Sequence, residues 1–205
     1  LAATPSVTES WLQPLEAHHN NLSVTISVMQ LIQTLKIARL VFASSAAVYG
    51  NPIQVPVTED HPTSPLSPYG LQKLVCEQYA NLFAKSFDFS FVGLRLFNVF
   101  GARQVPNSPY SGVISIFVSA MQQNLPITIY GDGRQTRDFV YVKDVAIAFT
   151  KALTLPLAPG SCYSCNLGTG KAITLLELVD ILKAQFPQWK SEVRFAPARL
   201  GDIQH

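Results

Sequence analysis

The sequence predicts an α/β fold, in which a parallel sheet flanked by helices is followed by a smaller α/β lobe. Two apolar runs, 39–45 and 89–97, lie on either side of a stretch with helical spacing that begins at Pro68. Strand, helix and strand in this order predict a βαβ crossover between parallel strands. From Gly112 the apolar pattern breaks into shorter elements. The first part of the chain is therefore expected to carry the sheet and the second part the smaller lobe.

Apolar spacing predicts the elements of the first half. A helix is expected from Asn20 to Leu35, because apolar residues recur there close to the helical period. The run 39–45 is short, apolar and ends in small polar residues, as a buried strand does. Four prolines between residues 51 and 67 exclude a long regular element. Pro68 then suits the first turn of a helix, which its apolar residues extend to Leu82.

The second half is predicted to consist of shorter elements. In order, we expect a helix through Met121, a strand at 127–130, a glycine turn at 131–133, an extended stretch at 138–142, a helix through Leu153 and a strand at 161–166. Thr174 and Glu177 have the spacing of a capping box, so they predict the start of one more helix.

Composition excludes several classes of protein. The chain has 205 residues, of which 48% are hydrophobic and 14% charged, and its net charge is +2. So small a charge favours neither a nucleic acid nor an anionic membrane surface as a partner. No apolar run approaches the roughly 20 residues that span a bilayer, and no signal-peptide pattern opens the chain. Three cysteines, an odd number, fit a reducing compartment, so the expected location is the cytoplasm.

No metal site is predicted. Cys162 and Cys165 form a C-x-x-C, but the segment 161–166 reads as a strand, on which side chains three apart point to opposite faces. The four histidines show no metal-ligand spacing among themselves: His18, His19, His61 and His205. We therefore expect no bound metal ion.

The sharpest local signal for chemistry is the pair Tyr69 and Lys73. Residues four apart on a helix lie one above the other, with Cβ atoms about 5–6 Å apart. An ammonium beside a phenol favours the phenolate, so we expect Lys73 to lower the pKa of Tyr69 and Tyr69 to act as a general base. Such pairs are also common on solvated helix faces. Ser45 strengthens the case, because it ends the preceding strand and can reach the same substrate oxygen.

Six stretches together carry a resemblance to a known family. They occur in the family's order over nearly the whole chain: Phe42–Gly50, Ser67–Lys73, Leu94–Gly101, Ile129–Val142, Asn166–Gly168 and Arg199–Asp202. In these stretches the chain resembles the extended short-chain dehydrogenase/reductase family, and within it the NAD-dependent nucleotide-sugar 4-epimerases and dehydratases.

The resemblance implies the C-terminal part of a Rossmann-like doubly wound parallel sheet plus a smaller α/β substrate-binding lobe. Residues 1–110 would form a partial NAD-binding domain, and residues 111–205 an incomplete substrate-binding lobe, with some interleaving. Members of the family are often homodimers through a four-helix interface, which would here include the helices near 22–36 and 70–86.

The resemblance also implies a role for each matched residue. The catalytic residues would be Ser45, Tyr69 and Lys73. NAD would be contacted by the same three residues together with Asn21 and Phe97. The nucleotide diphosphate of the sugar would be held by Asn98, Arg137, Arg199 and Asp202. Arginine suits this role because its guanidinium binds phosphate oxygens in pairs, and a carboxylate accepts hydrogen bonds from ribose hydroxyls. Surface ion pairs are the alternative role for the two arginines.

Two alanines favour an epimerase over a dehydratase. In the 4,6-dehydratases the motif after the strand resembles Ser-Thr-Asp-Glu, whose acidic pair serves in the loss of water. Ala46 and Ala47 stand at the acidic positions here, and alanine carries no acid or base. We therefore expect epimerisation at C4, in which hydride leaves the sugar for NAD and returns to its other face. The substrate would be UDP-glucose, UDP-galactose or an N-acetyl analogue; a sister dehydratase or reductase and an inactive fragment remain alternatives.

The chain also departs from the family at both ends. It contains no G-x-x-G-x-x-G, and it stops shortly after Asp202, so it is expected to be truncated. The residue that would select NAD over NADP is not among these 205. Without strands on its other side, the run 39–45 would be an open apolar edge, which favours association. We expect the isolated chain to be poorly folded or inactive.

Overall fold

In the computed structural model, the described residues are 3–106, 108 and 111–198. The main sheet has three parallel strands: β1 (Arg39–Ser45), β2 (Ser90–Leu96) and β7 (Cys162–Leu167), in the order β1-β2-β7. The register pairs Ser45 with Leu96 and Leu96 with Leu167, so the three strands end at one edge of the sheet. The parallel βαβ unit predicted from the sequence is confirmed.

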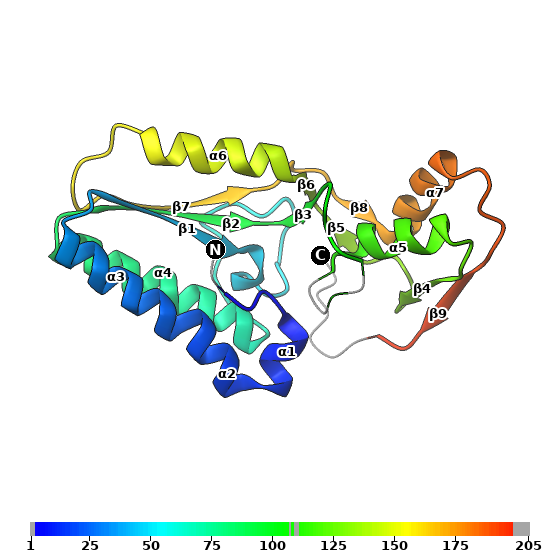
Figure 1. The fold of residues 1–205 in the computed structure, drawn as a ribbon, viewed down its shortest axis with the longest axis horizontal. Helices are drawn as coiled ribbons and strands as arrows, with labels where there is room; N and C mark the ends of the chain where they lie inside the picture. The colour runs from blue at the N-terminus through cyan, green and yellow to red at the C-terminus, as the bar shows by residue number, and fades with distance from the viewer. Residues whose placement is uncertain (1–2, 107, 109–110, 199–205) are drawn as a thin grey trace.

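Helices cover both faces of this sheet (Figure 1). On one face lie α3 (Val24–Leu35) and α4 (Pro68–Ser86), and on the other lies α6 (Val142–Thr154). Each face has its own apolar core. The first core is formed by Met29, Ile32, Ala80, Ala84, Phe89 and Phe91, and the second is centred on Val92, Leu94 and Ala152.

The two cysteines of β7 lie on opposite faces of the sheet. Cys162 packs against the core under α3 and α4, and Cys165 packs against the core under α6. This is the alternation expected of a strand, and it places the two thiols in separate environments. No group of three metal-ligating side chains occurs among the described residues.

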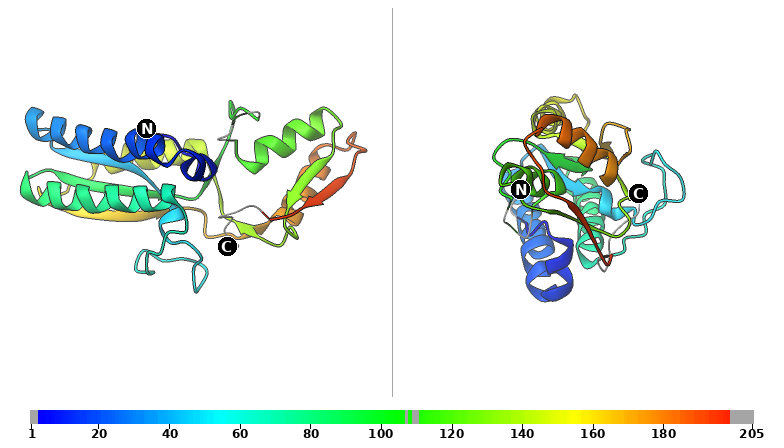
Figure 2. Two further views of the ribbon diagram at one scale, coloured as in Figure 1. Left: turned by 90° about the horizontal axis from the view of Figure 1, so that it is seen from below. Right: turned by 90° about the vertical axis from the view of Figure 1, so that its right-hand side faces the viewer.

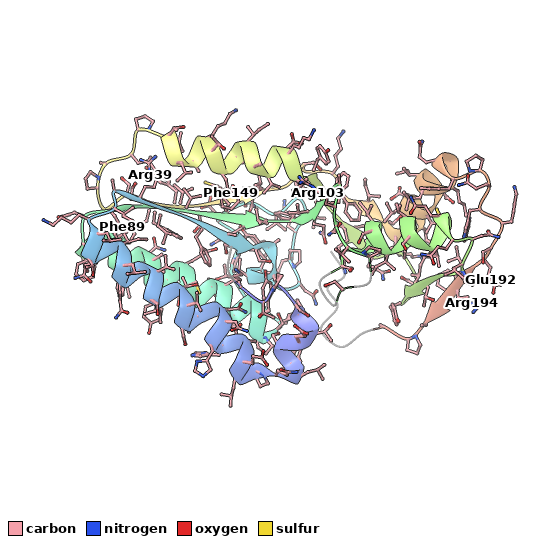
Figure 3. The ribbon with its side chains drawn as sticks, in the orientation of Figure 1. Arg39, Phe89, Arg103, Phe149, Glu192 and Arg194 are labelled. Atoms are coloured by element: carbon pink, nitrogen blue, oxygen red, sulfur yellow. The ribbon has the colours of Figure 1, made fainter. Side chains whose placement is uncertain are left out.

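Figure 3 labels three side chains that join the main sheet to the helices covering it. Arg39 reaches the end of α6 and donates hydrogen bonds to the carbonyls of Ala152 and Leu153, at 3.1 and 2.9 Å. The last carbonyls of a helix have no partner within the helix, so this arginine caps α6. Phe149 of α6 packs against the core on the same face, and Phe89 is buried in the core on the other.

The smaller lobe has a core of its own. Its helices are α5 (Val113–Gln122), as expected of the helix through Met121, and α7 (Leu175–Gln185), which begins at the predicted capping box of Thr174 and Glu177. Its strands β4 (Ile127–Tyr130) and β9 (Val193–Ala196) pair in parallel. A short antiparallel pair joins β5 (Thr136–Arg137) and β8 (Ile173–Thr174). The buried residues include Phe117, Met121, Ile127, Ile129, Leu178 and Trp189. Figure 3 shows the exposed Glu192–Arg194 pair at the far end of this lobe.

Another parallel pair lies between the main sheet and the smaller lobe. It joins β3 (Asn98–Phe100), which follows β2 directly, to β6 (Phe139–Tyr141), which leads into α6. Although β7 and α6 follow residue 111 in the chain, both belong to the main sheet and its cover. The domain boundary at residue 110 stays a prediction.

The amino-terminal region contains two short helices that the sequence pattern did not predict. Three short helical segments precede α3: α1 (Val7–Leu12), α2 (Pro14–His18) and a π-helical turn, η1 (His19–Ser23). Local chemistry sets the first two, because the Ser6 side chain caps α1 and Pro14 occupies the first turn of α2. No helix was predicted for α1 and α2, because each is too short to show a helical period, whereas η1 and α3 together cover the helix expected from Asn20 to Leu35. Figure 2 shows the loop between β1 and α4 projecting from the layers.

No helix of the described residues combines the length and the apolar character needed to cross a membrane.

Candidate active site

Ser45 is the last residue of β1 and begins a tight turn. Its backbone is extended, and its hydroxyl accepts a hydrogen bond from the Ala47 N–H at 3.1 Å. The hydroxyl thereby caps the 3-10 helix η2 (Ala46–Val48). The Ser45 side chain is fixed at the carboxyl edge of the sheet, where ligands of parallel sheets collect.

The start of α4 lies against this turn. A Cβ on Gly70 would come within 2.5 Å of the Ala47 carbonyl oxygen, so only glycine permits the close approach. Ser67 caps the helix by accepting from the Gly70 N–H at 3.1 Å, and Pro68 occupies the first position. This packing brings Tyr69 beside Ser45, within reach of a hydrogen bond between the two side chains.

The pKa of Tyr69 differs from the sequence-based expectation. Burial raises it above the ordinary value for a phenol, and the hydrogen bond with Ser45 opposes the rise only in part. We expected Lys73 to lower this pKa, and that prediction was wrong. The Lys73 ammonium lies 5.8 Å from the centre of the Tyr69 ring and donates instead to the Ala43 carbonyl at 2.9 Å.

Lys73 is a buried cation with few partners. Its residue is 5% exposed, and its ammonium also lies 4.8 Å from the centre of the Phe42 ring. Burial lowers the pKa of this lysine, an effect that the nearby Cys76 would oppose as a thiolate. Among the described residues the Ala43 carbonyl is its one hydrogen-bond acceptor, whereas an ammonium has three N–H donors. The site therefore offers spare donors to a polar ligand.

A cavity of about 430 Å³ opens at this edge of the sheet. Five residues singled out from the sequence line it together: Ser45, Tyr69, Lys73, Phe97 and Asn98. The rest of the wall comes from the amino-terminal segment, the ends of β1 and β2, β3, β6 and the entrance to the small lobe, including Ala3, Pro5, Phe100, Gln104, Gly112, Val113 and Phe139. A second hollow, of about 480 Å³ between Lys183, Trp189 and Glu192, lies away from all of these residues.

Asn21 lies elsewhere. It is 2% exposed, and its amide donates to the Gln72 side chain at 2.7 Å and accepts from the Thr4 N–H at 2.8 Å. It does not line the cavity. The structure gives Asn21 a role in tying the amino-terminal segment to α4, and contact with a cofactor stays a prediction.

The expected diphosphate ligands are only partly described. The backbone N–H of Asn98 donates to the Asp138 carbonyl at 2.9 Å, in the β3–β6 pair, and the residue lines the cavity. Arg137 is half-buried on β5, donates to the Thr136 carbonyl at 2.8 Å and is not part of the cavity wall. Arg199 and Asp202 lie outside the described residues.

A buried polar network behind the site was not predicted. Arg95 of β2 and Glu77 of α4 form an ion pair at 2.8 Å, with residue exposures of 7% and 2%. Glu77 also accepts from Ser44, the neighbour of Ser45, and Arg95 donates to the Tyr49 hydroxyl at 2.7 Å. Burial alone would lower the pKa of Arg95. Its hydrogen bonds to Glu77 and Tyr49 outweigh this effect, so the pKa of Arg95 is raised. One signal was available: a single arginine inside an apolar strand requires a buried partner.

The chain is similar in sequence and fold to several known proteins. A UDP-glucose 4-epimerase of Halalkalibacterium halodurans is 34% identical over 98% of this chain and 64% of its own length. Among solved structures, a UDP-N-acetylglucosamine 4-epimerase of Methanobrevibacter ruminantium in complex with UDP-N-acetylmuramic acid is 37% identical, with a TM-score of 0.93, over 100% of this chain and 64% of that one.

A third relative is the UDP-glucose 4-epimerase of Thermus thermophilus in complex with NAD. It is 34% identical, with a TM-score of 0.90, over 99% of this chain and 65% of that one. The chain thus spans somewhat less than two thirds of the length of these relatives. Its residues 1–168 match the model of the NAD dependent epimerase/dehydratase family. With this match over most of its length and a Rossmann-like sheet that ends in Ser45 beside Tyr69 and Lys73, the chain belongs to the NAD dependent epimerase/dehydratase family.

Proposed function

We propose that this protein epimerises a nucleotide-diphosphate sugar at C4, with NAD as its cofactor. The observation that carries the proposal is the convergence of Ser45, Tyr69 and Lys73 on one cavity at the carboxyl edge of the sheet. A hydroxyl, a phenol and a buried ammonium in one cavity suit the removal and return of a proton at a sugar hydroxyl. Membership of the family and the names of the relatives support the same reaction.

The residues present fit the nicotinamide end of NAD. The buried ammonium of Lys73 has donors to spare for ribose hydroxyls, and Phe97 supplies an aromatic wall to the same cavity. When bound, NAD supplies a reversible acceptor for hydride. No G-x-x-G-x-x-G occurs in the 205 residues, so we assign none of them to the pyrophosphate of NAD.

Tyr69 is the proposed acid and base. Since burial raises its pKa, the phenol carries its proton at neutral pH unless positive charge is brought closer. Ser45 lies within reach of the phenol and would hold the sugar hydroxyl close to it. Epimerisation needs a group that takes the proton and gives it back, and a phenol–serine pair can do both.

The choice between epimerase and dehydratase depends on the two alanines that begin η2, directly after Ser45. Elimination of water requires an acid and a base near the sugar, and the two residues after Ser45 are Ala46 and Ala47. Inversion at C4 without net redox is therefore the expected outcome. Formation of a 4-keto-6-deoxy sugar would identify a dehydratase instead.

We assign the nucleotide diphosphate to Asn98, Arg137, Arg199 and Asp202. Of the two members of this set that the structure describes, Asn98 lines the cavity and Arg137 does not, and arginines bind diphosphate oxygens in pairs. UDP is the proposed nucleotide, with glucose, galactose or an N-acetyl analogue as the sugar, in accordance with the names of the relatives.

A second copy of the chain is the proposed macromolecular partner, and the cytoplasm the proposed location. Apolar side chains are exposed along α3 and α4, among them Val28, Leu31, Leu35, Leu71 and Leu82. Apolar surface on two adjacent helices favours pairing with the same surface of a second copy. Free cysteines at 76, 162 and 165 fit a reducing compartment.

Calorimetric titration of NAD into the purified chain is the first test, with Lys73→Met as the variant that removes the proposed ribose donor. Saturable binding to the natural sequence and much weaker binding to the variant would support the assignment. The second test follows UDP-galactose formation from UDP-glucose by chromatography, with the N-acetyl pair alongside. Absence of NAD binding together with absence of C4 inversion would contradict the proposed function for this chain and favour the inactive fragment.

A further inference from the structure

The first turn of α4 carries the proposed base, and each of its N–H groups has an identifiable acceptor. The first N–H groups of a helix have no partner inside the helix and need one outside it. Pro68 has no N–H, the Gly70 N–H goes to the Ser67 hydroxyl, and the Leu71 N–H goes to the Ser67 carbonyl at 3.0 Å. The remaining N–H is that of Tyr69, and its acceptor is not part of α4.

Ser10 of α1 supplies that acceptor. Its hydroxyl oxygen lies 3.1 Å from the Tyr69 nitrogen, across 59 positions of sequence. The residue is fully buried, and its hydroxyl donates its own proton to the Val7 carbonyl at 2.7 Å. With the proton fixed in this way, a lone pair of the oxygen is directed at Tyr69. The α4 helix therefore has two serine caps, one local and one from a distant segment.

The segment that carries Ser10 is also tied to the cavity. Ala3 and Pro5, just before α1, line the cavity, and Thr4 bonds to the buried Asn21 at 2.8 Å. Ser6 caps α1 by accepting from the Glu9 N–H at 3.1 Å, which fixes the turn on which Ser10 lies. Ser10 thus belongs to a segment, residues 3–10, that is held in place by hydrogen bonds, lines the cavity and contacts the backbone of Tyr69.

We propose that Ser10 is a positioning residue for Tyr69, which keeps the phenol in line with Ser45. The inference rests on the proposed function, because it assumes that Tyr69 is the acid and base. Without the Ser10 oxygen, the Tyr69 N–H is left unpaired in a buried place, and the first turn can relieve this only by unwinding or by admitting water. Either change moves the Tyr69 Cα, and a shift of about 1 Å at a catalytic group lowers turnover by up to about 100-fold.

Ser67 provides a matched control. Both serines are at least nine-tenths buried, both accept one N–H of the same turn at 3.1 Å, and replacement by alanine removes one acceptor in each case. The N–H that Ser67→Ala leaves unpaired belongs to Gly70 rather than Tyr69. A merely structural role for Ser10 predicts equal effects of the two variants, whereas a positioning role predicts different ones.

The test compares the natural chain, Ser10→Ala and Ser67→Ala by amide hydrogen exchange in NMR spectra and by steady-state kinetics. In Ser10→Ala we expect the Tyr69 amide to exchange at least about 10-fold faster while Gly70 stays protected, and in Ser67→Ala we expect the reverse. Turnover should fall about 10- to 100-fold in Ser10→Ala with KM changed less than about two-fold, and less than about three-fold in Ser67→Ala.

Two results would overturn the proposal. One is a Tyr69 amide that remains protected in Ser10→Ala, since the hydrogen bond would then not hold it. The other is an equal loss of turnover in the two variants at equal loss of melting temperature, since Ser10 would then act through stability alone. Failure of the proposed function gives a different signature, because the natural chain would then show no turnover, and the exchange at Tyr69 would alone decide whether Ser10 holds that residue.

Discussion

The Lys73 ammonium lies 5.8 Å from the centre of the Tyr69 ring, while its hydrogen bond goes to the carbonyl of Ala43 on β1. The lysine is thus anchored to the strand rather than to the phenol. Both groups are buried, and burial acts on each in the direction of the neutral form: it raises the pKa of Tyr69 and lowers that of Lys73. The charged forms of both side chains are therefore unfavourable in this site until a bound ligand or a nearby opposite charge stabilises them.

Lys73→Met is expected to abolish turnover without lowering stability. Replacing a buried charge by an apolar side chain of similar length removes a desolvation penalty, so the free energy of unfolding near pH 7 should stay equal or rise by roughly 0.5–2 kcal/mol. Thermal melts of both proteins measure this. Lys85→Met, an exposed site on the same helix, is the control and should change neither property.

The stability advantage of Lys73→Met should also depend on pH. The pKa of Lys73 is lowered in the folded state. At pH values between that pKa and the ordinary lysine pKa, the unfolded chain therefore binds more protons than the folded chain. The natural chain therefore gains stability as the pH rises through this window, and the difference from the variant shrinks. Melts from neutral to alkaline pH test the sign; an advantage that grows with pH would contradict the assignment of a buried charged lysine.

Tyr69→Phe is expected to lower turnover far more than the binding of substrate. The phenylalanine keeps the ring and loses the hydroxyl that exchanges the proton, so kcat should fall by at least about 100-fold with KM nearly unchanged. Tyr79→Phe, more exposed on the same helix, is the matched control. Unchanged turnover in Tyr69→Phe would remove Tyr69 from the role of acid and base.

The raised pKa of Tyr69 predicts the pH dependence of the natural protein. If the phenolate is the active form, kcat/KM rises as the pH is increased from neutral into the alkaline range, because a larger fraction of Tyr69 is ionised. Ser45→Ala removes the hydrogen bond that opposes the rise in pKa, so the profile should move further towards alkaline pH. A profile that falls from neutral to alkaline pH would contradict this base.

Breaking the Arg95–Glu77 pair should destabilise the fold strongly. Arg95→Met leaves the Glu77 carboxylate buried without its cation, which costs about 3–5 kcal/mol of unfolding free energy. Glu77→Gln combined with Arg95→Met should recover part of this loss, because the uncompensated charge is then gone. Urea unfolding of the single and double variants measures the coupling. Arg194→Met, in an exposed pair with Glu192, should have no measurable effect.

Gly70→Ala is expected to destabilise the protein although alanine favours helices. In a free helix the change is worth up to about 1 kcal/mol in favour of alanine. At this position the new methyl group would lie 2.5 Å from the Ala47 carbonyl oxygen, so α4 must move away from η2 and carry Tyr69 away from Ser45. Thermal melts and turnover should both decrease; an increase in melting temperature with turnover intact would show that the close approach is not required.

Neighbouring residues in the sequence were enough to predict much of the secondary structure of this protein. The apolar runs at 39–45 and 89–97 and the helical period after Pro68 depend only on neighbouring residues, and β1, β2 and α4 follow them closely. The spacing of Tyr69 and Lys73 likewise places both on one helix face, since four residues make about one turn. Motif stretches in a fixed order were enough to indicate the family.

The contacts that those residues make with distant parts of the chain were decided by the tertiary structure alone. Ser10 reaches the Tyr69 backbone, and β9 pairs with β4, only because segments far apart in the sequence are packed together. The expected effect of Lys73 on Tyr69 failed for the same reason. Spacing along a helix fixes where side chains start, whereas burial and the nearest carbonyl fix where the ammonium points and which form of the phenol is favoured. Periodicity is a property of adjacent residues, but desolvation is a property of the whole packed core.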